Sequence, residues 1–249
     1  MPSITPIPAL NDNYIWLFSD GTHTVCIDPG QAGPVLGYLQ KNNLRLNQIW
    51  ITHHHHDHTG GIGELKQTFP DCIIYGNRDI TSADVLVGEG SVLNIGAYKA
   101  EVWAVPGHTA EHLSYLLDIS GRLHVFCGDT LFSAGCGRIF SGTAAQLAHS
   151  FQRFDNLPSD TLFYPAHEYT AANLRFAAYI EPDNQDIKQA GQSATRLPTL
   201  PVSLAHERRI NPFLRVKFLK HQVETLSGKK LSDETEIFAA LRELKDRFS

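Results

Sequence analysis

The segment His53–His58 groups residue types that bind transition metals. It contains five of the chain's 13 histidines, together with the carboxylate of Asp57. Neutral imidazole is the commonest protein ligand for transition metals, and imidazole mixed with carboxylate suits zinc or iron better than calcium or magnesium. An interior position, between a predicted strand and a helix-like segment, argues against a purification tag. The segment therefore predicts a metal centre.

The spacing of these ligands depends on the strand that precedes them. Residues 48–52 form a short apolar run with β-branched side chains, which predicts a buried strand that ends where the histidines begin. Side chains at i and i+2 of an extended segment point the same way, so we expect His53, His55 and Asp57 to face one cavity. The helical zinc spacing H-E-x-x-H is absent. His58 need not bind the same ion as His53, so two adjacent metals are expected.

The intervening residues His54 and His56 occupy the alternate positions of this segment. We expect them to point away from the metals and to form a solvated polar turn. His112 is expected to pack beside the site rather than to bind metal. These three histidines are therefore left out of the predicted ligand set.

Three later predicted strands or hairpins also end in a potential ligand. The predicted elements are a strand over 100–105, a hairpin over 113–127 and a strand over 163–166. His108, Asp129 and His167 follow them in turn, the first two beside glycines. Strand ends that repeatedly offer ligands to one edge predict an α/β layered fold with the site at that edge.

The predicted ligands are too numerous for one tetrahedral zinc ion, whose catalytic form keeps three protein ligands and an open position. They suit two ions that share a bridging carboxylate and a bridging water. Metal coordination lowers the pKa of water enough to supply hydroxide near neutral pH, so the implied chemistry is metal-assisted hydrolysis. The predicted metal ligands are His53, His55, Asp57, His58, His108, Asp129 and His167.

The remaining elements frame these ligands. An N-terminal hairpin ends at a chain reversal, Asp28–Gly30, and helices and strands then alternate as far as residue 169. From residue 170 the composition becomes mainly helical, so we predict two domains, 1–169 and 170–249. The predicted helices cover 34–41, 62–69, 171–179, 184–196 and 233–248, with a linker over 197–201 and strand-like alternation near 213–218.

Composition narrows the class of protein. The chain has 249 residues and a net charge of −5, so electrostatics do not favour a nucleic-acid partner. We expect no membrane partner, because there is neither a leader-like start nor an apolar run of about 20 residues. The four cysteines include no C-x-x-C pair, so buried reduced thiols and a cytoplasmic location are expected.

The motifs resemble a known superfamily. The segment His53–His58 with Gly60 and Gly61, and the later His108, Asp129 and His167, resemble the metallo-β-lactamase superfamily, whose signature is H-x-H-x-D-H. Four further segments resemble the glyoxalase II family, the hydroxyacylglutathione hydrolases. They are Cys136–Arg138, His167–Thr170, Asn211–Arg215 and Arg242–Asp246.

The resemblance implies an αββα metallo-β-lactamase sandwich followed by a small C-terminal helical substrate-binding domain. It implies hydrolysis of S-D-lactoylglutathione to D-lactate and glutathione, the second step of methylglyoxal detoxification, by attack of a metal-bridging hydroxide on the thioester. A monomer with two metals, zinc or else iron or manganese, is expected. The resemblance implies that the first metal is bound by His53, His55 and His108, and the second by Asp57, His58 and His167. It also implies that Asp129 bridges the two metals and that Asp57 and Asp129 are the catalytic residues.

The resemblance also implies substrate contacts. Arg138, Arg242 and Lys245 match the family's grip on the glycine carboxylate of glutathione, and the i, i+3 spacing of the last two puts them on one helix face. From the residues alone that face would be an ordinary solvated one. Tyr169 corresponds to a substrate-contacting tyrosine. Phe140 stands where many members carry another tyrosine, so the hydroxyl contact expected there is missing.

Two alternatives are open. The same fold serves β-lactamases, nucleases and persulfide dioxygenases, since fold alone does not determine function. A secreted lactamase should carry a leader peptide, and a nuclease should have a more basic composition. The dioxygenases use one iron and usually lack part of the second ligand set, whereas His58 and His167 are both present here. The other alternative is a non-catalytic metal-binding module, which a turnover assay separates from an enzyme.

Overall fold

The computed structural model describes residues 2–248, which form two compact units. The first unit contains the chain up to Ala104 and the segment Glu111–Gly128. The second contains Val105–Ala110 and the chain from Asp129 onward. The helical C-terminal part, which was predicted to begin at residue 170, lies inside the second unit. No helix among the described residues is long and apolar enough to cross a membrane.

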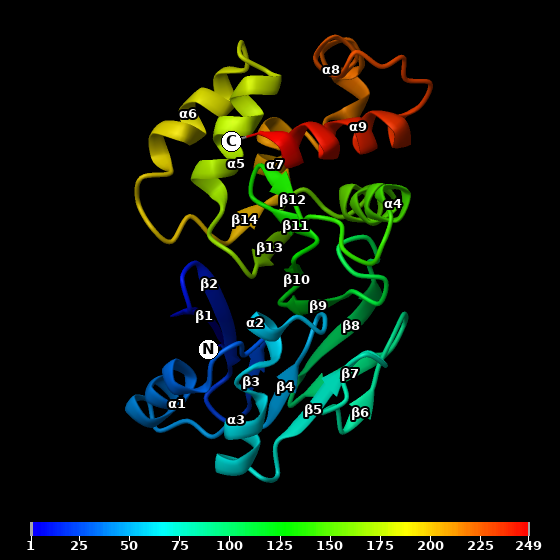
Figure 1. The fold of residues 1–249 in the computed structure, drawn as a ribbon. Helices are drawn as coiled ribbons and strands as arrows, with labels where there is room; N and C mark the ends of the chain where they lie inside the picture. The colour runs from blue at the N-terminus through cyan, green and yellow to red at the C-terminus, as the bar shows by residue number, and fades with distance from the viewer. Residues whose placement is uncertain (1, 249) are drawn as a thin grey trace. The chain divides into compact units, whose positions relative to one another are not determined.

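The first unit alternates strands and helices (Figure 1). One sheet has the order β1-β2-β3-β4-β5-β6, in which β3 to β6 are parallel, and the antiparallel strands β10-β9-β8-β7 are neighbours in another. The strands are β1 (Ser3–Ala9), β2 (Asn13–Ser19), β3 (Thr24–Ile27), β4 (Gln48–Trp50), β5 (Ile73–Gly76), β6 (Val85–Leu86), β7 (Val92–Ile95), β8 (Tyr98–Ala104), β9 (Leu113–Ile119) and β10 (Arg122–Gly128), and the helices are α1 (Ala32–Lys41), α2 (His56–Thr59) and α3 (Ile62–Thr68).

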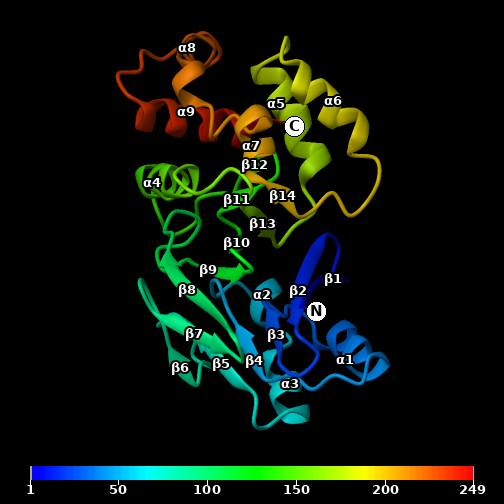
Figure 2. The same cartoon turned by 180° about the vertical axis from the view of Figure 1, so that it is seen from behind.

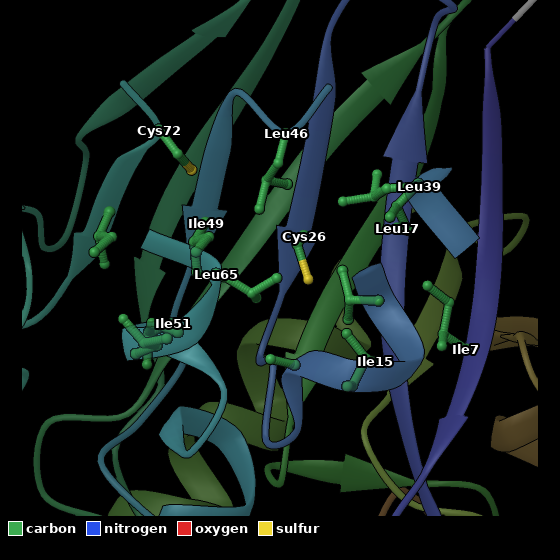
Figure 3. Packing of buried hydrophobic residues seen from close by; sticks show 14 of the residues in the cluster. Ile7, Ile15, Leu17, Cys26, Leu39, Leu46, Ile49, Ile51, Leu65 and Cys72 are labelled. Atoms are coloured by element: carbon green, nitrogen blue, oxygen red, sulfur yellow. The ribbon is translucent and has the colours of Figure 1, made fainter. Parts of the chain in front are cut away.

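Apolar side chains hold the layers of this unit together. Figure 3 shows Leu39 of α1 and Leu65 of α3 in one buried cluster with strand residues such as Leu17 and Ile49. On the other face of β4, the ring of Trp50 stacks on Tyr115 of β9 with 5.0 Å between centroids. Burying each such large side chain contributes roughly 1.5–3 kcal/mol. The unit is therefore a rigid frame for the ends of its parallel strands.

The second unit is mainly helical (Figure 2). Its strands form two short antiparallel pairs, β11 with β12 and β13 with β14. The elements are β11 (Leu131–Phe132), β12 (Gly135–Cys136), α4 (Ala144–Asp155), β13 (Leu162–Pro165), α5 (Thr170–Ile180), α6 (Gln185–Ser193), β14 (Val202–Ser203), α7 (Leu204–Ile210), the 3-10 helix η1 (Val216–Phe218), α8 (Lys220–Ser227) and α9 (Glu234–Arg247).

Phenylalanine rings join the helices of the second unit. The ring of Phe213 lies 6.2 Å from Phe151 of α4 and 5.1 Å from Phe238 of α9, and all three side chains are buried. The strand-like alternation near 213–218 does not produce a strand, so that prediction is wrong. The side chain of Asn211 accepts a hydrogen bond from the backbone N–H of Phe213 at 3.1 Å, which turns the chain into the core instead.

The other predicted elements are confirmed within a few residues at their ends. Asp233, the first residue of the helix predicted over 233–248, accepts a hydrogen bond from the N–H of Glu236 at 2.9 Å and caps α9. All four cysteines are free and buried, as predicted. Several elements were not predicted, among them the helices α4, α7 and α8 and the strands β6, β7, β11, β12 and β14.

A buried carboxylate on α7 makes stability depend on pH. Burial raises the pKa of the Glu207 carboxyl from 4.5 to about 7, although hydrogen bonds from Ala134, Asn211 and Ser133 lower it. The unfolded chain releases this proton first, so the group's contribution to stability is fully present below about pH 4.5 and is lost as the pH rises through about 7. The shift corresponds to about 3 kcal/mol.

We therefore expect Glu207→Gln to become more stable relative to the unsubstituted protein as pH rises. An uncharged amide avoids the cost of ionisation, so the gap should widen between about pH 5 and pH 8 by up to about 3 kcal/mol. Urea unfolding of both proteins at several pH values measures it. A difference that stays constant over this range would show that Glu207 titrates normally.

Candidate metal centre

The parallel strands β3 and β4 bring Asp28 and Thr52 together. The carboxylate of Asp28 accepts hydrogen bonds from the Thr52 backbone N–H at 2.8 Å and from its hydroxyl at 2.7 Å. It also accepts from Nδ1 of His58 at 3.0 Å. Because the Thr52 hydroxyl donates to Asp28, its oxygen accepts from Nδ1 of His53 at 3.0 Å. Both histidines thus carry their proton on Nδ1, which leaves Nε2 as a metal-binding lone pair.

The donor atoms that could bind metal lie close together in two pairs. Nε2 of His53 lies 3.0 Å from Nδ1 of His55, so one ion at about 2.1 Å from each can bind both. Nε2 of His58 lies 3.4 Å from Oδ2 of Asp57. Asn13 donates to the same Asp57 oxygen at 3.2 Å, which orients the carboxylate. The donor chemistry of this set fits zinc, iron or manganese.

The extended geometry predicted for Asp57 is wrong, because the extended segment stops at His55. That residue has φ −61° and ψ 146°, and α2 begins at His56. Asp57 therefore reaches the site from the first turn of a short helix. The loop after β3 packs tightly against this turn, and a Cβ on Gly30 would lie 1.8 Å from the Asp57 carbonyl oxygen. Glycine is needed there for the close approach.

The histidines left out of the ligand set lie as predicted. His54 and His56 are exposed. His112 is fully buried, and its ring stacks on His53 with 4.7 Å between centroids. The stacked ring restricts the orientation of His53.

The second unit holds the remaining three predicted ligands side by side. Nε2 of His108 lies 3.5 Å from Oδ2 of Asp129, and Nε2 of His167 lies 3.4 Å from Oδ1 of the same carboxylate. Nδ1 of His108 donates to the carbonyl oxygen of Arg138 at 2.6 Å, which again leaves Nε2 for metal. One carboxylate whose two oxygens face different histidines has the arrangement of a bridging ligand.

A glycine lets the chain pass close behind this carboxylate. A Cβ on Gly137 would lie 1.9 Å from the carbonyl oxygen of Asp129 and 3.1 Å from Nδ1 of His108. The N–H of Gly137 donates to the carbonyl of Thr130 at 3.1 Å. Any side chain at this position would displace the segment that carries the acceptor for His108.

The predicted cationic substrate contacts also gather in the second unit. Arg138 and Arg242 both approach Oδ1 of Asp246, at 3.5 and 3.0 Å. Arg242 is buried, and it donates to the carbonyl of Cys136 at 3.0 Å, so its face of α9 is not the ordinary solvated one. Burial, and then the positive charge of Arg242, lowers the pKa of Lys245. Arg138 and Arg242 thus share the Asp246 carboxylate, and the charges of Arg242 and Asp246 also act on Lys245.

The predicted aromatic contacts lie against the metal-binding histidines. The ring of Tyr169 stacks on His167 with 4.7 Å between centroids and 7° between planes. The ring of Phe140 meets His108 edge-on at 5.2 Å and is 62% exposed. An exposed ring beside a ligand is placed to touch a bound molecule.

Three supporting residues were not predicted from the sequence. Asp28 was interpreted as part of a turn, and Thr52 and Asn13 as strand residues. Asp129 was identified because it is a carboxylate directly after a strand, and Asp28 has the same local pattern. Its φ of +52° places it in the left-handed region, which aspartate tolerates better than most residues.

Both the N-terminal and the C-terminal part of the chain match a known protein family. Residues 10–98 match the family model described as the metallo-beta-lactamase superfamily, and residues 168–248 match that of the hydroxyacylglutathione hydrolase C-terminus. A protein of Neisseria meningitidis serogroup A named hydroxyacylglutathione hydrolase is 56% identical over 98% of this chain and 99% of its own length. The chain belongs to the hydroxyacylglutathione hydrolase family. A relative of that name from Hahella chejuensis is 44% identical, with both chains fully covered.

The fold agrees with this family, whose members are thioester hydrolases. The solved structure of ETHE1 from Myxococcus xanthus has a TM-score of 0.66 and 28% identity, and the match covers 98% of each chain. The predicted metallo-β-lactamase fold, with mixed α/β sheets and a helical C-terminal part, is confirmed. The described residues include His/Asp groups that could hold a metal ion, in keeping with this fold.

Proposed function

We propose that the chain hydrolyses S-2-hydroxyacylglutathione thioesters, foremost S-D-lactoylglutathione, to the 2-hydroxy acid and glutathione. This would be the second step of methylglyoxal detoxification. The observation that carries the proposal is Asp129, whose two oxygens face Nε2 of His108 and of His167. The family membership supplies the substrate class. We also propose that the protein is cytoplasmic and monomeric.

Two metal ions, zinc or else iron or manganese, are proposed to be held by the predicted ligands. His53, His55 and His108 would hold one, and Asp57, His58 and His167 the other, with Asp129 shared. When bound, the two ions supply Lewis acidity toward the thioester carbonyl and a hydroxide near neutral pH. The ring tautomers set by Asp28, Thr52 and Arg138 fit this use, because each directs Nε2 of a histidine toward metal.

The chain's own residues would then bind and orient the thioester. Asp57 and Asp129 hold negative charge at the centre, and Asn13 orients Asp57 by donating to its Oδ2 at 3.2 Å. The leaving group is a thiolate, which departs without a strong general acid. No residue of this chain is therefore assigned to protonate it.

The C-terminal part, residues 170–249, is proposed to be the substrate-binding domain together with the loop of Arg138. Arg138, Arg242 and Lys245 would bind the glycine carboxylate of glutathione, in competition with Asp246. A carboxylate ligand is well matched to this cluster, because charge-assisted bonds from guanidinium groups are the stronger ones. Tyr169 and Phe140 would line the path to the metals.

An assay of purified, metal-analysed protein tests the proposal. We expect rapid loss of thioester absorbance with S-D-lactoylglutathione, and little with a non-glutathione thioester or a β-lactam. About two metals per chain are expected, in line with a two-metal hydrolase site. Full metal occupancy without turnover of the glutathione thioester would discard the substrate and leave the fold.

Phe140→Tyr is expected to restore a hydroxyl contact with substrate. One added hydrogen bond contributes about 0.5–1.5 kcal/mol, so KM should fall about two- to tenfold while kcat changes little. Steady-state kinetics with S-D-lactoylglutathione measure both constants. Phe218→Tyr is the matched control, because Phe218 is also 62% exposed and lies on η1. An unchanged KM, or an equal fall in the control, would remove Phe140 from the substrate contacts.

A further inference from the structure

We infer that Glu207 and Asn211 are positioning residues for the proposed hydrolysis. The inference rests on that function, but neither residue belongs to its metal or substrate groups. Glu207 lies in the middle of α7 and Asn211 caps its C-terminal end, and both hold the turn between β11 and β12. That hairpin begins two residues after Asp129 and ends two residues before Arg138. Its position therefore decides where both of those site residues lie.

Three buried side chains satisfy the polar groups of the turn. Glu207 accepts from the Ser133 hydroxyl at 2.9 Å and from the Ala134 N–H at 2.8 Å. Asn211 donates from Nδ2 to the carbonyls of Phe132 at 3.1 Å and Gly135 at 3.0 Å. Asn173 of α5 donates to the Ser133 carbonyl at 3.0 Å. Glu207 also accepts from Asn211 at 2.9 Å, so the two act as one unit.

The turn needs such support because its backbone is unusual. Ala134 has φ +55°, in the left-handed region that residues with a side chain rarely adopt. Glu207 and Asn211 are both fully buried, so water does not replace their hydrogen bonds. A buried carboxylate is costly to keep without a paired cation, and none of the described cations forms an ion pair with Glu207. The donors to Glu207 come from the turn and from Asn211.

Through the hairpin, the position of the turn determines the positions of residues in the site. Leu131 pairs with Cys136 across it, and Gly137 then donates to the Thr130 carbonyl. Beyond the hairpin, the carbonyl of Arg138 accepts from Nδ1 of His108. A displaced turn would therefore move the Asp129 carboxylate and the acceptor that sets the His108 tautomer. Glu207 and Asn211 touch neither substrate nor metal, so they act through the hairpin.

Paired substitutions test this role. Glu207→Gln keeps every contact, because the amide oxygen accepts from Ala134 and Asn211 while the amide nitrogen donates to the Ser133 oxygen. Glu207→Ala leaves those groups unsatisfied, and Asn211→Asp places an acceptor against two carbonyls. Glu181→Gln is the control, since it weakens the ion pair with Arg215 near α7 without touching the hairpin.

We expect Glu207→Ala and Asn211→Asp to lower kcat and metal affinity per folded chain by about 10- to 100-fold, the usual effect of losing an outer support of a metal site. Glu207→Gln should rescue kcat, and Glu181→Gln should lower the unfolding midpoint without lowering kcat. The folded fraction is measured by circular dichroism, and retained metal by analysis after dialysis.

The inference is overturned if Glu207→Ala keeps full kcat and metal, if Glu207→Gln is as damaging as Glu207→Ala, or if activity falls only in proportion to the folded fraction. Absence of turnover in the unsubstituted protein would instead reject the proposed function. In that case metal retention decides the role of Glu207, because the alanine variant should still lose metal that the glutamine variant keeps.

Discussion

Replacing Asp129 by Asn is expected to reduce kcat/KM for S-D-lactoylglutathione by about a thousandfold, which corresponds to about 4 kcal/mol of lost transition-state stabilisation. The amide has nearly the same size, so packing around this buried position is retained. It has only one oxygen, however, whereas the carboxylate presents one oxygen to His108 and another to His167. An amide nitrogen does not bind metal, and one negative charge is lost between two dications.

Steady-state kinetics and metal analysis of the same preparation measure this effect. Asp71→Asn is the control, because Asp71 pairs with Arg45 on the surface and its side chain is 83% exposed. The control should keep full activity and metal. An Asp129→Asn protein with an intact rate would reject the bridging role, even if its metal content were reduced.

Replacing Asp28 by Asn is expected to weaken metal binding by about 10- to 100-fold, through the tautomer of a histidine rather than through loss of a ligand. Asn tolerates the left-handed backbone of position 28, so the turn is preserved. Its amide oxygen can still accept from the Thr52 N–H, but the amide nitrogen replaces the oxygen that accepts both from the Thr52 hydroxyl and from Nδ1 of His58. The amide nitrogen then faces Nδ1 of His58 and donates to it, which moves the histidine proton to Nε2 and removes the metal-binding lone pair.

A chelator-competition titration measures the loss of metal affinity. Asp20→Asn is the matched control. Asp20 also contacts a histidine, His23, with 3.1 Å between Nδ1 and Oδ2, but this pair is partly exposed and lies in a turn. Equal metal affinity in the Asp28→Asn and Asp20→Asn proteins would show that Asp28 does not control His58.

Ligands that directly follow strands were predictable because both signals are local. His108, Asp129 and His167 each lie within four residues of the end of a strand. Asp57 was placed in the correct site but the wrong conformation, because α2 depends on the packing of Gly30, which lies far away in sequence. The role of Asp28 was missed for a related reason. Its partners, Thr52 and His58, become neighbours only when β3 and β4 pair in parallel.

The helical part was less predictable. The alternation near 213–218 resembles a strand, but Phe213 packs into a cluster with Phe151 and Phe238, which are distant in sequence. Arg242 was predicted from the family resemblance, and its burial against Cys136 follows from contacts that no local pattern contains. The network around Glu207 is equally non-local.

The burial of the four free cysteines has a consequence for an enzyme that would release glutathione at its own site. Thiol–disulfide exchange requires a thiolate, and burial raises the pKa of Cys136 to about 11 and of Cys72 to about 12. At neutral pH only about one Cys136 thiol in ten thousand is ionised. Cys26 is fully buried and its pKa is raised well above the ordinary value. These thiols therefore resist mixed-disulfide formation with oxidised glutathione, so the folded protein should keep its activity in an oxidising glutathione buffer.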